Sequence, residues 1–311
     1  MENIEENILP NENKVSIIEQ TLENIILDPK IQVEYDTLVV SGGSSKVLLT
    51  IGSLQYCYDN FLLKNIKNYI GTSSGAILCY LLIIGYSPID IIIYACTNQL
   101  LEKLAHMNVV AMLNGGGASS FSSIYEQLEK MSIEKLGYIP TFQDLKDRFG
   151  VDFTCITYNI TENKTEFLSY ENYPTLPCLI AIRMSSNLPL IFEKYRYGNS
   201  FYVDGGISCN FGINVGIKKG NNVLGIWINS NVNTSLETDA NISGNIIEYI
   251  YKLMFISITQ TTMDTINNVK DKCKIVFLHT NKISHFRFNI NSAEKLDLFS
   301  DGYQQTKESF E

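Results

Sequence analysis

The sequence of 311 residues is poor in the residue types that build metal sites and disulfide frameworks. It contains three histidines and seven cysteines, and the cysteines are scattered without a Cys-x-x-Cys pair. An odd number of dispersed thiols, several of them in apolar segments, is typical of buried cysteines in a reducing compartment. We therefore expect neither disulfides nor a metal centre.

Positive charge and long hydrophobic runs are also scarce. The 24 Lys and Arg residues face 33 Asp and Glu residues, which gives a formal charge of −9 and disfavours nucleic acid as a partner. The same charge disfavours strong electrostatic docking to anionic membranes, although weak apolar contact with lipid stays open. The longest apolar run, 76–84, is far shorter than the roughly 20 residues that span a bilayer. The first thirty residues are acidic, unlike a secretory leader, so we expect an intracellular, cytoplasmic protein with no signal peptide or transmembrane segment.

Short apolar segments alternate with helical patterns along most of the chain. This alternation predicts an α/β fold, a three-layer αβα sandwich with a mostly parallel central sheet. The arm 1–35 is expected to carry a short helix at 14–27, and 36–311 to form a single domain. Capping boxes are predicted at Ser123 and Thr141. Strands are predicted at 37–40, before Gly71, and at 152–158, 164–169, 200–204, 222–228 and 274–278; helices are predicted at 46–58, 76–84, 89–136 with a break at 114–117, 141–148, 176–186, 245–271 and 291–307.

The most informative stretch is Gly71-Thr72-Ser73-Ser74-Gly75, between a short apolar strand and an apolar helix. This layout is that of a nucleophile elbow, in which a serine on a sharp turn exposes its hydroxyl at the start of a helix. The glycines suit a strained turn in which backbones approach closely. The pentapeptide alone is weak evidence, so it needs a base and an oxyanion site elsewhere in the chain.

Two other motifs can supply these parts. The turn Ser41-Gly42-Gly43-Ser44-Ser45-Lys46 follows the first strand, and amides in such a turn can form an anion site. It does not fit the dinucleotide fingerprint, because Gly-x-Gly-x-x-Gly is absent. The motif Val203-Asp204-Gly205-Gly206 places an aspartate at the end of a strand, where α/β sites gather. Taken alone, each motif also fits an ordinary turn.

In order and content, the three motifs resemble those of the patatin-like phospholipases, which are lipid acyl hydrolases. The family pattern is a glycine-rich oxyanion turn, then Gly-x-Ser-x-Gly, then Asp-Gly-Gly or Asp-Gly-Ala. The segment Arg183-Met-Ser-Ser-Asn-Leu-Pro189 also resembles the family's lead-in to its aspartate. The likeness runs from about residue 36 to the C-terminal helix and implies a patatin-type variant of the α/β-hydrolase idea, with 36–311 as its catalytic domain.

The resemblance implies a Ser–Asp dyad without histidine, in which Ser73 is the nucleophile and Asp204 accepts its proton. The amides of Gly43 and Ser44, with Gly42 shaping the turn, would hold the oxyanion. The supporting motif positions are Lys46, Gly71, Gly75, Gly205 and Gly206. The implied activity is phospholipase A-type hydrolysis of glycerolipid acyl esters in lipid degradation, with transient lipid-surface contact and no cofactor or calcium.

This chain departs from the family at three positions of the oxyanion turn. Ser44 and Val47 stand where the family usually has glycine, and Lys46 replaces its common arginine. The amide of Ser44 can still donate if its backbone angles suit a residue with a side chain, and Val47 is expected to affect mainly helix packing.

Two other interpretations remain open. An ordinary α/β-hydrolase, an esterase or thioesterase, would use a Ser73-Asp204-His279 triad, because His279 follows an apolar strand late in the chain. A catalytically impaired lipid-binding protein on the same fold is the second. The apolar segment 89–113 fits either an acyl channel, a lipid-contacting surface or ordinary core-facing helices, and Gly115-Gly116-Gly117 is interpreted as a loop or lid.

Overall fold

The computed structural model describes residues 33–98, 101, 116–229, 246–283 and 287–311. The chain divides into two units, Met1–Glu34 and Tyr35–Glu311, and all the elements below belong to the second. The predicted helix at 14–27 lies outside the described residues, as do His106 and most of the apolar segment 99–113.

The described strands form one eight-stranded sheet in the order β5-β6-β3-β2-β1-β7-β8, with β4 paired to β3 beside this path. The strands β2, β1, β7 and β8 run parallel to one another and to β3, whereas β4, β5 and β6 are antiparallel additions at one side. Their bounds are β1 Thr37–Val40, β2 Asn68–Thr72, β3 Asp152–Asn159, β4 Lys164–Leu168, β5 Tyr195–Tyr197, β6 Ser200–Asp204, β7 Val223–Ile228 and β8 Cys273–Leu278. The sheet is therefore mixed but mostly parallel, as the sequence predicted.

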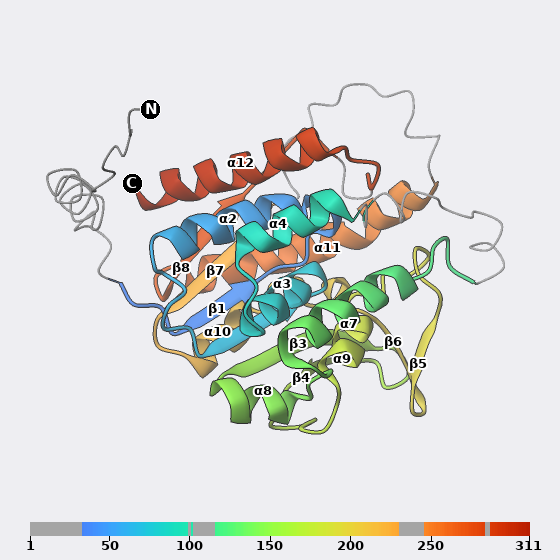
Figure 1. Cartoon of the computed structure of the whole chain (residues 1–311). Coiled ribbons are helices and arrows are strands. Elements are labelled where there is room, and N and C mark those ends of the chain that lie inside the picture. Colours follow the sequence, from blue (N-terminus) through green and yellow to red (C-terminus); the bar gives the residue numbers. More distant parts are fainter. Residues whose placement is uncertain (1–32, 99–100, 102–115, 230–245, 284–286) are drawn as a thin grey trace, which may run out of the picture. The chain divides into compact units, whose positions relative to one another are not determined.

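Helices cover both faces of this sheet (Figure 1). Their bounds are α2 Val47–Asp59, α3 Ser74–Ile83, α4 Pro88–Thr97, α7 Ser122–Leu136, α8 Phe142–Phe149, α9 Cys178–Ser185, α10 Ile213–Lys219, α11 Ile246–Val269 and α12 Ser292–Phe310. On one face, Val39, Ile70 and Ile156 pack against α10 and α11. On the other, the ring of Phe153 contacts Tyr80 of α3 and Phe142 of α8, with centroids 6.4 and 5.5 Å apart. This arrangement confirms the predicted three-layer αβα class.

The C-terminal helix α12 lies along α2 and beside α4 (Figure 1). A Cβ on Gly52 of α2 would lie 1.8 Å from the carbonyl oxygen of Phe299, and one on Gly302 would lie 2.0 Å from that of Leu49. Only glycine permits this close approach of two helix backbones. Lys295 of α12 is fully buried and donates to the carbonyl oxygen of Ala95 near the end of α4. Helix α12 thus supports α4, whose inner residues line the pocket described below.

Sequence and structure disagree at a few local points. The capping box at Thr141 is confirmed, since its hydroxyl accepts from the Asp144 amide and the Asp144 carboxylate accepts from the Thr141 amide. The one at Ser123 is wrong: α7 begins a residue earlier, after Phe121, and has no side-chain cap. Burial of the Phe121 ring against Phe192 sets this start. Strand β5 was not predicted, because its three residues show no apolar alternation.

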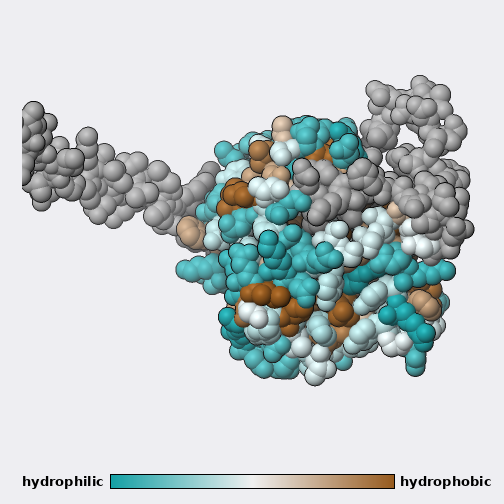
Figure 2. Space-filling view, turned by 45° about the vertical axis from the view of Figure 1, so that its right-hand side comes forward, coloured by the Kyte–Doolittle hydropathy of each residue, from teal (hydrophilic) through white to brown (hydrophobic). Residues whose placement is uncertain are grey.

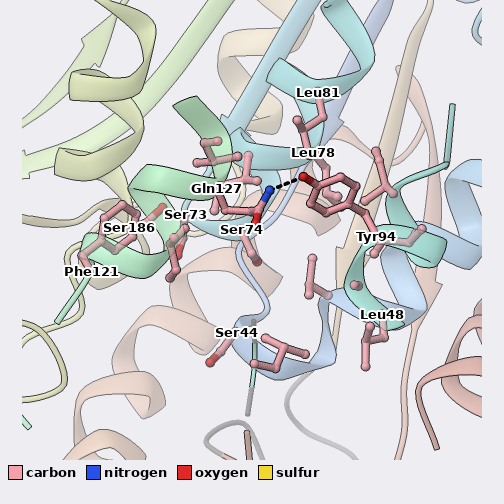
Figure 3. Close-up of a pocket in the computed structure, with 18 of the residues that line it drawn as sticks. Ser44, Leu48, Ser73, Ser74, Leu78, Leu81, Tyr94, Phe121, Gln127 and Ser186 are labelled. Carbon is pink, nitrogen blue, oxygen red and sulfur yellow. Dashed lines mark hydrogen bonds between the residues drawn. The ribbon is translucent and has the colours of Figure 1, made fainter. Parts of the chain in front are cut away.

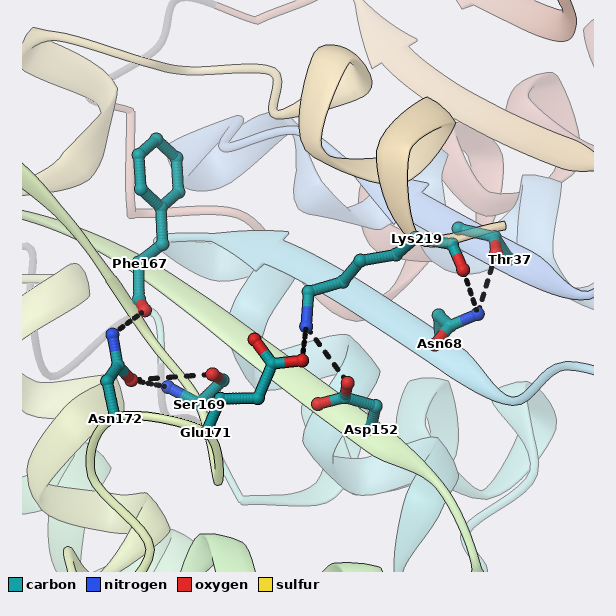
Figure 4. Close-up of polar contacts among 8 residues, drawn as sticks. All are labelled: Thr37, Asn68, Asp152, Phe167, Ser169, Glu171, Asn172 and Lys219. Atoms are coloured by element: carbon teal, nitrogen blue, oxygen red, sulfur yellow. Dashed lines mark hydrogen bonds and ion pairs between the residues drawn. The ribbon is translucent and has the colours of Figure 1, made fainter. Parts of the chain in front are cut away.

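A network of polar side chains lies where β1, β2 and β3 begin (Figure 4). Lys219, the last residue of α10, forms ion pairs with Asp152 of β3 at 2.9 Å and with Glu171 at 3.4 Å. Asn68 of β2 donates to the hydroxyl of Thr37 and to the Lys219 carbonyl oxygen. These contacts join the entry of the parallel strands to the loop that follows β4.

Candidate active site

Ser73 sits on the turn between β2 and α3 with φ 53° and ψ −124°, an uncommon conformation for a residue with a side chain. The flanking glycines allow this turn. A Cβ on Gly71 would lie 2.4 Å from the Cα of Ala76, and one on Gly75 would lie 2.4 Å from the carbonyl oxygen of Val40. The turn therefore has the geometry of a nucleophile elbow, with the serine at the start of α3.

The hydroxyl of Ser73 donates a hydrogen bond to Oδ2 of Asp204 over 2.6 Å. Both residues are buried, with exposed fractions of 7% for Ser73 and 2% for Asp204. Asp204 ends a strand, as expected from the sequence, but this strand is not one of the parallel strands of the sheet. The strand is β6, which runs antiparallel to β3 and pairs Asp204 with Thr157, one residue beyond the Ile156 that pairs with Thr72. The two residues meet because β6 approaches from the opposite direction and stops halfway along β3.

Among the residues that the structure describes, no cation pairs with the Asp204 carboxylate to favour its charged form. Its Oδ1 accepts from the Gly206 amide at 2.7 Å, and its Oδ2 accepts from Ser73. Burial raises the pKa of Asp204 from 3.8 to about 7, and these two hydrogen bonds oppose the rise. A carboxylate with such a pKa is a far better proton acceptor at neutral pH than an exposed aspartate.

Ser185 holds the strained backbone of the elbow in place. Its hydroxyl accepts from the Ser73 amide at 2.8 Å and donates to the carbonyl oxygen of Ile156 at 2.5 Å. The side chain is fully buried, so these backbone groups have no water to replace it. The sequence analysis quoted the segment that contains Ser185 but assigned this residue no role.

Arg183 fixes the approach of Asp204 from the same segment. Its guanidinium lies over the rings of Phe121, Phe192 and Tyr195 and donates to Oδ1 of Asn187 at 2.7 Å. Asn187 in turn accepts from the Asp204 amide through its backbone carbonyl at 2.9 Å. The segment that precedes β6 therefore positions both Ser73 and Asp204.

The glycine-rich turn after β1 approaches the elbow, but two of its amides are already bound. The Gly42 amide donates to the carbonyl oxygen of Asn210 at 3.2 Å, so Gly42 shapes the turn rather than facing substrate. The Gly43 amide donates to the Ser74 hydroxyl at 3.0 Å. Ser44 has φ 49°, and its amide has no hydrogen-bond acceptor among the described residues. Of these three amides, only that of Ser44 has no acceptor among the described residues.

The other two positions at which this chain departs from the family pattern follow Ser44 closely in the chain. Lys46 ends a 3₁₀ turn, Ser44–Lys46, and is 6% exposed; burial lowers the pKa of its ammonium group to about 8. Val47 begins α2 and also lines the pocket, so it contributes to the pocket wall in addition to the helix packing expected from the sequence.

An apolar cavity of about 160 Å³ opens beside Ser73 (Figure 3). Its wall comes from α2, α3, α4 and α7 and includes Leu48, Ile77, Leu78, Leu81, Leu128 and Met131. Tyr94 of α4 and Gln127 of α7 also line it and form a hydrogen bond with each other. The segment 89–113 thus contributes to the pocket through Ile91 and Leu101, to the core through Ile92, and to the surface through Ile89 and Ile93. A predominantly apolar pocket with a few polar groups suits a hydrocarbon chain that ends in a polar reacting group.

His279 lies away from this pair, and the triad alternative is not supported. It follows β8, three strands from β2 in the sheet, and its side chain is exposed. Its backbone amide and carbonyl are held by the side-chain amide of Gln305 on α12. The direct bond between Ser73 and Asp204 leaves no histidine between them. Among the described residues, no group of three or more His, Cys, Asp and Glu side chains could hold a metal ion.

A model of the patatin-like phospholipase family matches residues 38–217, more than half of the chain. The matched range contains the glycine-rich turn, the elbow and Asp204. The chain belongs to the patatin-like phospholipase family. It is 34% identical over 200 residues to the probable lipid hydrolase 463L of Invertebrate iridescent virus 6, covering 62% of this chain and 68% of that protein. It is 26% identical over 281 residues to the uncharacterized protein R571 of Acanthamoeba polyphaga mimivirus, covering 87% and 92%.

Solved structures share this patatin fold at low sequence identity. VipD from Legionella pneumophila matches with a TM-score of 0.51 and 15% identity, over 89% of this chain and 67% of that chain. ExoU in its complex with SpcU from Pseudomonas aeruginosa matches with a TM-score of 0.50 and 15% identity, over 88% and 51%. At such identity the likeness concerns the fold alone, and it confirms the patatin-type architecture expected from the motifs.

Proposed function

We propose that this chain is a lipid acyl hydrolase of the phospholipase A type, which cleaves acyl esters of glycerolipids and glycerophospholipids. The observation that carries the proposal is the 2.6 Å hydrogen bond between Ser73 and Asp204 at the head of an apolar pocket. Family membership and the relative named as a probable lipid hydrolase support the lipid class of substrate. Exposed Ile89 and Ile93 on α4 are candidates for transient contact with a lipid surface.

In the proposed cycle, the oxygen of Ser73 attacks the ester carbonyl carbon while its proton moves to Oδ2 of Asp204. The carbonyl oxygen becomes an oxyanion held by the Ser44 amide and, after Ser74 rotates, by the Gly43 amide. Each such donor typically contributes about 3–4 kcal/mol to the transition state. The bond to the alcohol oxygen then breaks, the alcohol takes the proton from Asp204, and the acyl group stays on Ser73.

Water completes the cycle. It attacks the acyl-enzyme, passes a proton to Asp204, and the fatty acid leaves as Ser73 regains its proton. The raised pKa of Asp204 suits this alternation between proton acceptor and proton donor near neutral pH. Calcium independence is part of the proposal, and rates in the presence and absence of a chelator test it.

The surface carries limited hydrophobic area in the view of Figure 2, where hydrophobic patches are separated by hydrophilic residues. With a formal charge of −9, the chain offers little electrostatic attraction to anionic lipid. We therefore propose that contact with a membrane is weak and brief, which rates on vesicles of neutral and anionic composition can test.

The test of the function is labelling and product analysis. A fluorophosphonate should label the wild-type protein at Ser73 and should not label Ser73→Ala. Mass spectrometry of a mixed lipid extract incubated with the wild type should show released fatty acids and lysolipids, and Ser73→Ala should release none. If the folded wild type is neither labelled nor active on any ester, the alternative of a catalytically impaired lipid-binding protein replaces this proposal.

A further inference from the structure

Two serine hydroxyls in the wall of the pocket have no hydrogen-bond partner in the part of the chain that the structure describes. They belong to Ser44 in the turn after β1 and to Ser186 in the segment between α9 and β6. Both oxygen atoms are buried, and Ser186 as a whole is only 5% exposed. Burying a hydroxyl without a partner is unfavourable, so a protein rarely keeps one without a use for it.

The serine hydroxyls around them are all paired. Ser73 donates to Asp204, Ser74 accepts from the Gly43 amide, and Ser185 bridges the Ser73 amide and the Ile156 carbonyl. The unpaired state is therefore not a general property of serines near the elbow. Among the described residues, three buried hydroxyls lack a partner: those of Ser44 and Ser186 line the pocket, and that of Thr154 lies on β3 outside it.

The two hydroxyls approach Ser73 from different elements. In the view of Figure 3, Ser186 lies on the same side of Ser73 as Phe121, whereas Ser44 lies below Ser73 and Ser74. Ser44 belongs to the turn proposed to hold the carbonyl oxygen. Ser186 belongs to the segment that leads to Asp204, which returns the proton to the alcohol oxygen in the proposed cycle. An ester above Ser73 would thus have its carbonyl oxygen toward Ser44 and its alcohol part toward Ser186.

We propose that Ser44 and Ser186 are substrate-binding residues that hold the two sides of the scissile ester. The Ser44 hydroxyl donates to the carbonyl oxygen, and the Ser186 hydroxyl donates to an oxygen atom of the alcohol part. This inference rests on the proposed function and narrows it. Because an ester of glycerol carries further oxygen atoms close to the scissile bond, Ser186 selects glycerol esters over esters of simple alcohols.

The first experiment compares two substrates that share one acyl group, a 1-monoacylglycerol and the ethyl ester of the same fatty acid. Ser186→Ala should lower the ratio of their kcat/KM values by about 3- to 10-fold, the usual effect of losing one neutral hydrogen bond. The matched control is Ser120→Ala, an exposed serine outside the pocket, which should leave the ratio unchanged. An unchanged ratio in an active Ser186→Ala enzyme overturns the role of Ser186 and leaves the proposed function intact.

The second experiment separates the hydroxyl of Ser44 from its backbone. Ser44→Gly removes the hydroxyl and also suits φ 49° better, so its thermal midpoint should be equal to or higher than that of the wild type. Its kcat/KM should nevertheless fall about 3- to 10-fold on both esters, since both share the carbonyl oxygen. Wild-type or faster turnover by Ser44→Gly overturns the role of Ser44.

The third experiment needs no turnover. Calorimetry measures binding of 1-O-octylglycerol, an uncleavable ether, and of octanol to the wild type and Ser186→Ala. The variant should lose affinity for octylglycerol relative to octanol by about 3- to 10-fold. A wild type that binds octylglycerol in this way but hydrolyses no ester refutes the proposed function and retains the binding site; equal losses for both ligands refute the binding site.

Discussion

The buried carboxylates at the two ends of the parallel strands differ in their partners. Where the strands begin, Asp152 has Lys219 at 2.9 Å, and Asn68 and Asn172 satisfy nearby hydroxyl and carbonyl groups (Figure 4). At the other end of the sheet, none of the described residues places a cation beside Asp204, and the hydroxyls of Ser44 and Ser186 have no hydrogen-bond partner among those residues. Both aspartates are nearly buried, at 7% and 2% exposed. The entry end, where the strands begin, therefore neutralises its buried carboxylate with a cation, although Oδ1 of Asp152 and the hydroxyl of Thr154 lack partners there. The exit end, beside Ser73, leaves its buried carboxylate without a cation and keeps two unpaired hydroxyls in the pocket wall.

Removing the charge of Asp204 tests the exit end most severely. Asp204→Asn keeps the shape of the side chain but cannot accept a proton from Ser73, so kcat/KM should fall by about 10⁴-fold or more. In the wild type, kcat/KM should rise with pH through about 7, because only deprotonated Asp204 is a base. The measurement is ester hydrolysis from pH 5 to 9 with both proteins, and a wild-type rate that is flat across pH 7 would contradict the assignment.

Asp204→Asn should also be more stable to unfolding than the wild type at high pH. Because the folded-state pKa of Asp204 lies above its unfolded value, the stabilising contribution of the neutral carboxyl is present below pH 3.8 and lost as pH rises through about 7. The shift corresponds to a cost on the order of 4 kcal/mol above pH 7. Asp204→Asn avoids that cost, so urea unfolding at pH 9 should give it the larger free energy of unfolding, and at pH 4 the two proteins should be similar.

Substitution of Lys219 tests the entry end, where the parallel strands begin. Lys219→Met leaves Asp152 without its cation, which should lower the free energy of unfolding by about 2–4 kcal/mol, since breaking a largely buried pair exposes the remaining charge to an apolar environment. The kcat of the folded fraction should stay unchanged, because the pair lies at the opposite end of the strands from Ser73. Lys219→Met combined with Asp152→Asn should recover part of the stability. A fall in kcat without a loss of stability would contradict the view that the Lys219–Asp152 pair affects stability and not catalysis.

The exit end was the easier of the two to predict from the sequence. Ser73 and Asp204 occur in short motifs whose residue types follow from the chemistry and from the tight turns that display them. The helices and strands from β1 to α3 follow clear apolar patterns, and their bounds agree closely with the prediction. The entry end has no such signal, because Lys219 of α10 and Asp152 of β3 are far apart in the chain and meet only when the helix packs on the sheet.

Other parts of the site could not be predicted because they depend on tertiary contacts. The antiparallel approach of β6 is set by its pairing with β3, which no local pattern encodes. Ser185 and Ser186 are adjacent in sequence and alike in type, yet one hydroxyl is paired to backbone and the other faces the pocket. Only the orientation of the segment after α9 distinguishes them.

Substitution of Ser185 tests whether the exit end also depends on hydrogen bonds that are already formed in the folded protein. Ser185→Ala leaves the Ser73 amide and the Ile156 carbonyl unsatisfied, which should cost about 1–3 kcal/mol of stability. The elbow at φ 53° would lose its support, and kcat should fall by about 10- to 100-fold with little change in KM. Ser185→Thr, which keeps the hydroxyl, should recover more activity than Ser185→Ala. A variant that loses stability but retains the wild-type kcat would show that Ser185 supports the fold alone.

The smallest expected effect concerns Ser74, whose hydroxyl occupies the Gly43 amide. If that amide is to bind the oxyanion, the bond to Ser74 must break in every turnover, at a cost of about 0.5–1.5 kcal/mol. Ser74→Ala removes this competitor, so kcat/KM should rise by about 2- to 10-fold while the thermal midpoint stays close to that of the wild type. Initial rates on one soluble ester measure the change. A fall in rate would mean that the Ser74 hydroxyl itself donates to the oxyanion. The oxyanion would then be held by a side chain that is hydrogen-bonded in the free enzyme, rather than by the Gly43 amide.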